Sequence, residues 1–134
     1  MPQGCQRDRM RLPQPVPELP VDDVQAAGTS YARLMGFGVD WAYGDALAGV
    51  SRDDARMFLR RRTPEEARER YSVLIWLNMA SSAEVDQLHV EWTERGALIV
   101  EELRTAPYNL REFTAQDPDG NRIRVFYDLG KQGA

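Results

Sequence analysis

The spacing of apolar and polar positions changes along the first half of the chain and predicts five secondary-structure elements in order. Residues 16–21 (VPELPV) alternate with a period of two, which predicts a short strand weakened by its prolines. From Val24 to Met35 apolar residues recur at helical spacing, with Asp22 as the expected N-cap and Gly36 as the stop. Turn signals then separate three predicted strands, at residues 37–43, 46–51 and 55–61.

The second half of the chain repeats this order of elements. A long strand is predicted at residues 71–79, followed by a helix that begins after Ser81 or Ser82 and ends at Gly96. Gly36 and Gly96 stand 60 residues apart at equivalent positions of the two halves. Because a repeat of whole βαβββ modules is more informative than any single strand, we expect a duplicated α+β fold. Three further strands are predicted at residues 97–102, 110–116 and 122–127.

These elements predict one domain with flexible ends. The linker starts with Thr63, Pro64 and Glu66, which predict a capped helical turn. Residues 1–15 are expected to be a flexible N-terminal segment and residues 130–134 a tail. The domain, residues 16–129, divides into module one at 16–62, the linker at 63–70 and module two at 71–129.

Composition limits the partners and the location that are expected for this chain. The 134 residues carry a net charge of -4, which argues against a nucleic-acid partner and favours cationic ligands. Cys5 is the only cysteine, so the sequence holds no disulfide framework. No apolar run is long enough for a membrane span and no signal peptide is evident, so a soluble cytoplasmic protein is expected.

Candidate catalytic groups are few. The only histidine, His89, falls on the second predicted helix between its apolar positions and is interpreted as an exposed structural residue. No Ser-His-Asp set is evident. The last predicted strand follows an Asp-Pro-Asp-Gly-Asn turn and carries Arg122 and Arg124 on one face. Ile123 and Val125 share the other face, which is the expected core side.

Three segments in order carry a family resemblance. They are DVQAAGTSYARLMGF at 23–37, EVDQLHVEWTERG at 84–96 and REFTAQDPDGNRIRVF at 111–126. On a duplicated βαβββ module they resemble the vicinal oxygen chelate superfamily, which includes glyoxalase I, extradiol dioxygenases and the fosfomycin and bleomycin resistance proteins. The resemblance implies two tandem βαβββ modules forming curved mixed sheets, a cup in each module and a dimeric assembly.

The resemblance also implies where a metal would bind. Enzymes of this family hold a divalent metal with His and Glu side chains from the first and last strands of each module. In this chain the corresponding positions fall near Val16, at residues 57–59, near Leu74 and at Arg124, and all are apolar or cationic. A metal needs several convergent donors, so no metal or other cofactor is expected and the chain is interpreted as a non-enzyme.

Within the superfamily the sequence is most similar to the bleomycin resistance proteins, through residues 39–62, 88–96 and 107–113. These proteins are dimers that sequester a planar cationic glycopeptide in grooves between subunits. The similarity implies that aromatic rings stack the ligand and that acidic side chains attract its positive charge. The expected ligand-binding residues are Trp41, Trp76, Tyr108, Asp40 and Asp45. Trp76 is also compatible with a core position, and Trp92 is assigned to the core.

Three hypotheses therefore remain open at the level of the sequence. The first is a metal-free binding protein of the bleomycin-resistance type that sequesters a planar cationic small molecule or antibiotic. The second is a metal-dependent lyase or dioxygenase with an atypical site, and the third is a module in which only the dimer matters. A homodimer is expected in the first and third, and the prolines at 13, 15, 17 and 20 predict a stiff arm at its interface.

Overall fold

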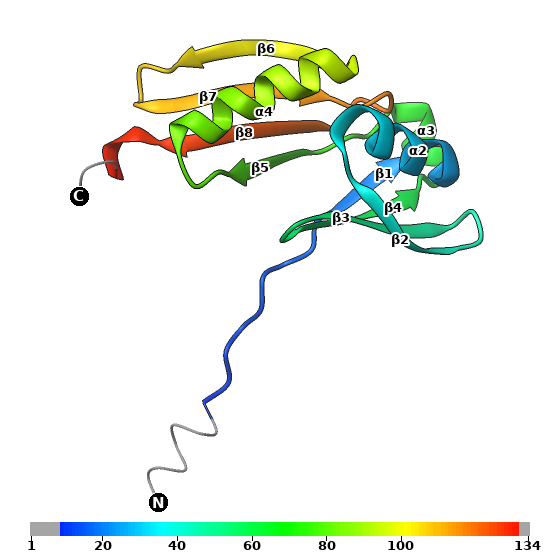
Figure 1. Ribbon diagram of the computed structural model, residues 1–134. Coiled ribbons are helices and arrows are strands. Elements are labelled where there is room, and N and C mark those ends of the chain that lie inside the picture. Colours follow the sequence, from blue (N-terminus) through cyan, green and yellow to red (C-terminus); the bar gives the residue numbers. More distant parts are fainter. Residues whose placement is uncertain (1–8, 132–134) are drawn as a thin grey trace, which may run out of the picture.

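The computed structural model describes residues 9–131 and shows two modules that follow each other along the chain (Figure 1). The short helix α3 (Pro64–Glu69) connects them. The first module contains β1 (Glu18–Val21), α2 (Val24–Met35), β2 (Gly38–Tyr43), β3 (Leu47–Arg52) and β4 (Ala55–Arg61). The second contains β5 (Leu74–Asn78), α4 (Ser82–Arg95), β6 (Leu98–Thr105), β7 (Leu110–Gln116) and β8 (Arg122–Asp128), followed by the 3-10 turn η1 (Leu129–Lys131).

Both modules build a four-stranded sheet with the same topology. The strand orders are β1-β4-β3-β2 in sheet A and β5-β8-β7-β6 in sheet B, with the first strand parallel to the last and the other pairs antiparallel. The predicted α+β fold of two tandem βαβββ modules with curved mixed sheets is confirmed. The strand predicted at 71–79 is shorter, because its partner β8 begins at Arg122, opposite Leu74. The strand predicted at 97–102 extends to Thr105.

Each sheet has one face covered by the helix of its own module. Helix α2 buries Val24, Ala27, Tyr31 and Met35, while α4 buries Val85, Leu88 and Trp92. As predicted, Trp92 is a core residue, and its indole N–H donates to the Met35 carbonyl oxygen at 3.1 Å, which joins the two helices. The opposite face of each sheet has no helix of its module over it, and we call it the open face (Figure 1).

Local signals set the helix ends, with one correction. Helix α2 is capped by Asp23 and not by Asp22, since the Asp23 side chain accepts from the Ala26 backbone N–H at 3.0 Å. Asp22 is engaged elsewhere, because its own backbone N–H donates to Asp119 Oδ1 at 3.0 Å. The other predicted signals are confirmed: a capping box at Thr63 and Glu66, the N-cap Ser81, and the left-handed glycines Gly36 and Gly96.

The Asp-Pro-Asp-Gly-Asn turn joins the two modules. Asp117 Oδ2 accepts a 2.7 Å hydrogen bond from the buried Tyr31 hydroxyl of α2, and Asn121 Nδ2 donates to the Pro20 carbonyl oxygen at 2.8 Å. Burial, and then the nearby Asp117, raise the pKa of Tyr31 well above its usual value, so the hydroxyl keeps its proton. Arg62 adds a 2.6 Å bond to the Asp119 carbonyl oxygen. The hydrogen bonds of this turn therefore connect the second module to the first.

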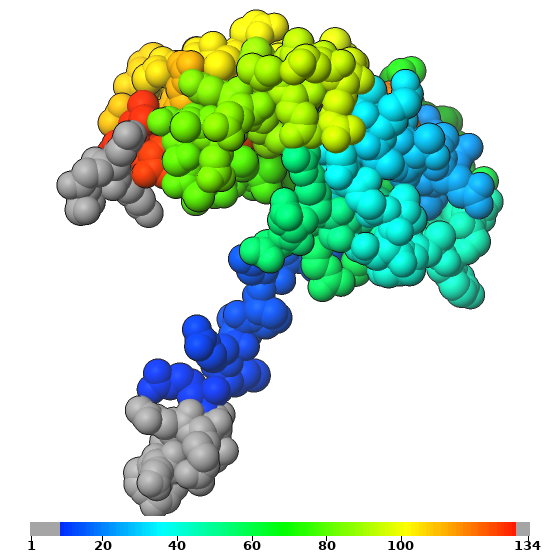
Figure 2. Space-filling model, viewed as in Figure 1, coloured from blue at the N-terminus to red at the C-terminus, as the bar shows by residue number. Residues whose placement is uncertain are grey.

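Residues 9–17 form an extended arm before β1. The arm is exposed up to Pro15 and stands clear of the body of the molecule (Figures 1 and 2). Its root is fixed by one backbone hydrogen bond, from the Phe58 N–H to the Pro17 carbonyl oxygen at 2.9 Å. Within residues 9–131, no helix is both long and apolar enough to cross a membrane. Cys5 lies outside the described residues.

Candidate functional site: the open faces of the two sheets

The open face of sheet A carries an aromatic platform. Trp41 stands opposite Gly49 in the β2–β3 register, and Gly49 stands opposite Phe58. Because Gly49 has no side chain, the Trp41 indole lies close over its backbone and meets Phe58 edge-on, with ring centroids 5.3 Å apart. Trp41 remains 38% exposed and Tyr43, two residues along the same strand, 75% exposed. The sequence placed Trp41 on a strand, but only the register shows the glycine beneath it.

The two predicted acidic residues near this platform differ in their partners. Asp45 forms an exposed ion pair with Arg61 at 2.9 Å, so its charge is partly neutralised. Asp40 is exposed and has no ion-pair partner in the described part of the chain. Of the two carboxylates, Asp40 is the one available to an incoming cation.

The open face of sheet B is polar and internally paired. Its central row, read across the register, runs through Trp76, Arg124, Thr114 and Glu101. The Arg124 guanidinium lies over the Trp76 ring, 4.8 Å from the centroid, and donates to Glu101 at 2.6 Å and to Thr114 at 3.0 Å. The Thr114 hydroxyl, and then Arg124, lower the pKa of the Glu101 carboxyl. Trp76 is 49% exposed and hence not a core residue.

A second polar cluster on the same face involves Tyr108, which lies in the loop after β6. Its hydroxyl donates to Glu112 Oε2 at 2.6 Å, and Arg104 contacts the same oxygen at 3.3 Å. Glu112 is buried, and its Oε1 has no hydrogen-bond partner among residues 9–131. Tyr108 itself is 54% exposed. Glu112 was not predicted as a site residue, although period-two alternation with the core residue Phe113 assigns it to this face.

The open faces do not suit a divalent metal. On the first and last strands of each module the central open-face positions are Glu18, Phe58, Trp76 and Arg124. Glu18, a carboxylate not predicted from the sequence as a ligand, is paired with Arg60 at 2.7 Å. One engaged carboxylate, two aromatic rings and a cation do not form a donor set. Among residues 9–131, no three His, Cys, Asp or Glu side chains are grouped so as to hold a metal ion.

His89 is less exposed than predicted. Its side chain is 18% exposed, lies 3.2 Å from Glu102 Oε1 and meets the Phe113 ring edge-on. It packs on the helix side of sheet B, away from both open faces. The prediction of a structural histidine is consistent with these contacts, although the expected exposure was wrong because α4 turns this residue toward β6.

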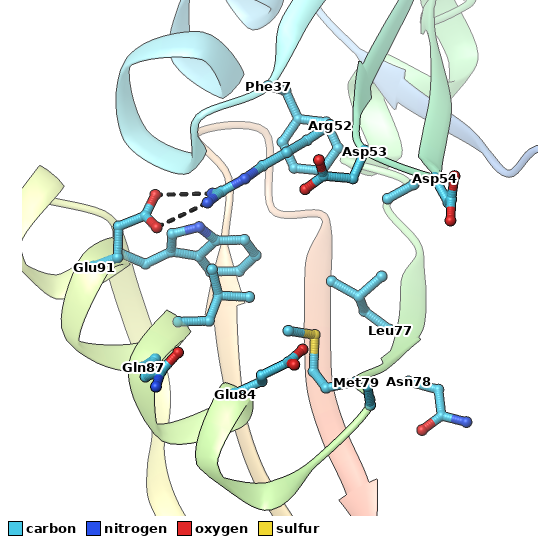
Figure 3. A pocket seen from close by; sticks show the side chains of 14 residues that line it. Phe37, Arg52, Asp53, Asp54, Leu77, Asn78, Met79, Glu84, Gln87 and Glu91 are labelled. Atoms are coloured by element: carbon cyan, nitrogen blue, oxygen red, sulfur yellow. Dashed lines mark hydrogen bonds and ion pairs between the residues drawn. The ribbon is translucent and has the colours of Figure 1, made fainter.

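Two adjoining clefts separate the modules. One, the helix-side cleft, has a volume of about 490 Å³ and lies between α4, the end of β5 and the β3–β4 turn (Figure 3). The other, the arm-side cleft, has a volume of about 710 Å³ and is lined by Pro13–Pro17, by Arg56 and Met57 of β4, and by Trp76. Trp41 and Tyr108 line neither cleft. Within one chain, Trp41 belongs to sheet A, whereas Trp76 and the loop residue Tyr108 lie on the open side of sheet B.

Two tandem βαβββ modules with one open face each define the class of this protein. The family model described as the glyoxalase/bleomycin resistance protein/dioxygenase superfamily matches residues 12–125, and the chain belongs to this superfamily. The resemblance read from the sequence is thus confirmed. A comparison with curated proteins gives no match.

Solved structures share the fold. A bleomycin-binding protein from bleomycin-producing Streptomyces verticillus, complexed with copper(II)-bleomycin, is 25% identical with a TM-score of 0.71, over 87% of this chain and 97% of that one. Another bleomycin-binding protein complexed with bleomycin is 18% identical, with a TM-score of 0.71, over 87% and 98% of the two chains. A family member from Nocardioides is 15% identical, with a TM-score of 0.71, over 98% and 93%.

Proposed function

We propose that this chain is a metal-free binding protein of the bleomycin-resistance type, which sequesters a planar cationic small molecule or antibiotic. The observation that carries the proposal is the exposed Trp41 indole on its Gly49 and Phe58 support. A rigid aromatic face of this kind stacks planar rings at little cost in side-chain entropy. The fold shared with two bleomycin-binding proteins supports the same class of ligand.

The binding groove is proposed to form between the subunits of a homodimer. Trp41 lies on the open face of sheet A, whereas Trp76 and Tyr108 lie on that of sheet B. A groove that uses all three rings therefore pairs the sheet A face of one subunit with the sheet B face of its partner. With two-fold symmetry the dimer has two equivalent grooves.

The charges of the two faces orient the ligand in this groove. On sheet B the stacking face near Trp76 is shared with Arg124, and Arg122 on the same strand has no acidic partner in the described range. The charge of Arg122, which no carboxylate in that range offsets, repels cationic groups of a ligand at close range. On sheet A, Asp40 precedes Trp41 in β2, is exposed and has no ion-pair partner among residues 9–131. We therefore assign the positive end of the ligand to the Asp40 side and its planar rings to Trp41 and Trp76.

The proposal is tested by titrating the protein with copper-free bleomycin and following tryptophan emission and heat release. Binding with a Kd below about 1 µM, equivalent to at least ~8 kcal/mol, is expected. Trp41→Ala should weaken binding at least tenfold, while Tyr71→Ala, which removes an exposed aromatic ring from the connector, should not change it. Unchanged emission together with a flat calorimetric trace would contradict antibiotic binding. Stoichiometric metal in the purified protein, with lyase or dioxygenase activity, would favour the alternative hypothesis.

A further inference from the structure

The helix-side cleft is a cavity between the modules that the proposed ligand groove does not use. Its volume of about 490 Å³ lies within the roughly 300–1,000 Å³ that is usual for small-molecule sites. None of Trp41, Trp76 and Tyr108 lines it. A ligand bound in this cleft would therefore occupy a second site, whether or not the open faces bind an antibiotic.

The floor of this cleft is apolar. Phe37, Leu77 and Met79 are among the residues that line it. Leu77 and Met79 pack against the core but are only partly buried, so each leaves apolar surface that a bound molecule can cover. Covering this surface removes it from water, which favours a ligand with an apolar body.

The mouth of the cleft is acidic on two sides. Asp53 and Asp54 lie in the β3–β4 turn of the first module, and Glu84 lies in the first turn of α4 in the second. Figure 3 shows these carboxylates on opposite sides of Leu77. None of the three carboxylates accepts a hydrogen bond or forms an ion pair within residues 9–131. A cation placed between them would be attracted from both modules.

Arg52 lines the cleft as well, but it does not offset the acidic mouth. It is held by Glu91 through two hydrogen bonds of 2.8 Å, one to each carboxylate oxygen. This bidentate pair is shown by the dashed lines in Figure 3. The guanidinium charge is thus matched by a carboxylate of the same cleft, and the three remaining carboxylates present a net negative field to an incoming ligand.

We propose that the helix-side cleft is a second binding site, which takes a small organic ammonium ion with an apolar body. The apolar body covers Leu77 and Met79, and the ammonium group lies at the mouth among Asp53, Asp54 and Glu84. An ammonium group has three donors and no acceptor, which suits carboxylates that lack donors. Because the site draws on both modules, its occupation also links the β3–β4 turn to the start of α4.

Binding is tested by adding phenethylamine to protein whose methionine methyl groups are isotope-labelled for NMR. The Met79 methyl resonance should shift saturably, with a dissociation constant on the order of 1 mM or tighter, while that of the exposed Met10 stays in place. Phenethyl alcohol, which has a hydroxyl in place of the ammonium, should bind at least about tenfold more weakly. Methylamine, which lacks the apolar body, should cause no shift. A Met79 resonance that does not move, or that responds equally to the alcohol, would overturn the proposal.

Charge removal locates the ammonium group. Asp54→Asn/Glu84→Gln keeps the size of both side chains and should weaken phenethylamine binding at least about fivefold, while binding of phenethyl alcohol stays the same. Glu69→Gln/Glu94→Gln, which neutralises two exposed carboxylates outside the cleft, is the matched control and should leave the dissociation constant unchanged. Equal effects of the two pairs would mean that the amine responds only to net charge, and would refute the site.

The Met79 resonance also distinguishes a small cation from another protein chain as the occupant of the cleft. Without ligand, its position should not depend on protein concentration, and phenethylamine should shift it at every concentration. If a second copy of the chain filled the cleft, the resonance would change with protein concentration and the amine would compete with that change. Such competition would overturn the proposal, because the cleft would then be an interface between subunits.

Discussion

The central rows of the two open faces occupy equivalent positions, but the row in sheet A is mainly aromatic and the row in sheet B is mainly polar. In sheet A the row is Glu18, Phe58, Gly49 and Trp41, and in sheet B it is Trp76, Arg124, Thr114 and Glu101. Sheet A has a glycine in the third place, which lets an indole settle on the backbone. Sheet B has a threonine there, which donates to Glu101 at 2.6 Å and accepts from Arg124.

This difference separates two ways of holding an exposed tryptophan. Trp41 is supported by shape, through the absence of a Cβ beneath it and the edge of Phe58. Trp76 is supported by charge, through Arg124, and by the edge of Phe126 at 5.4 Å. A duplicated fold therefore preserves its backbone while the side chains on the open faces diverge. The comparison predicts that sheet B is sensitive to loss of polar groups and sheet A to added volume.

The largest effect is expected from Arg124→Met in sheet B. The arginine is mostly buried, and its loss leaves Glu101 and Trp76 without their shared partner. Loss of the cation–π contact, of the hydrogen bond to Thr114 and of the partly exposed ion pair should together lower the free energy of unfolding by about 2–3 kcal/mol, measured by urea denaturation. Arg56→Met, at an exposed position on β4 of sheet A, should change it by less than about 0.5 kcal/mol. Similar losses for both variants would erase the proposed contrast.

The next effect concerns two of the exposed tyrosines, Tyr108 and Tyr43. Tyr108→Phe removes the hydroxyl that donates to the buried Glu112 and should lower the free energy of unfolding by about 1.5–2 kcal/mol. Tyr43→Phe removes a hydroxyl that is exposed on sheet A and should have no measurable effect. Thermal denaturation of both variants checks this pair, and an equal response would show that Glu112 does not depend on Tyr108.

A smaller effect is expected from added volume on sheet A. A Cβ at Gly49 would clash with Trp41 Nε1, so in Gly49→Ala the indole must move. We expect a loss of about 1 kcal/mol in unfolding free energy and a red shift of the tryptophan emission. At Gly38 the added Cβ would meet only the Ser51 carbonyl oxygen at 4.0 Å, so Gly38→Ala is the control. Identical spectra for the two variants would show that Trp41 does not rest on Gly49.

The smallest effect is the dependence of stability on acid that Glu101 of sheet B contributes. Because Thr114 and Arg124 lower the pKa of Glu101 in the folded state, its contribution to stability is present above the unfolded value near 4.5. The contribution is lost as the pH falls through the folded pKa. Since the carboxylate is partly exposed, the change should stay under about 1 kcal/mol. Urea midpoints of the parent and Glu101→Gln, taken between about pH 6 and about pH 3, should converge with acidification.

The sequence predicted most of the backbone because the relevant signals are local. Helix caps, glycine stops and the change from period two to helical spacing are read within a few residues of where they act. The same alternation correctly placed Ile123 and Val125 toward the core and Arg122 and Arg124 on the other face. The predicted helix N-cap at Asp22 was wrong, because the Asp22 backbone contacts Asp119, which lies 97 residues away in sequence.

What the sequence determined by itself was the duplicated module, its helices and the side of each strand that faces the core. Only the tertiary structure decided that Asp117 accepts a hydrogen bond from Tyr31, that Trp41 rests on Gly49 and that Arg124 stacks on Trp76. The physical reason is that these contacts depend on strand register and on the packing of one module against the other. Register fixes which residues meet across a sheet, and no pattern within a single strand contains that information.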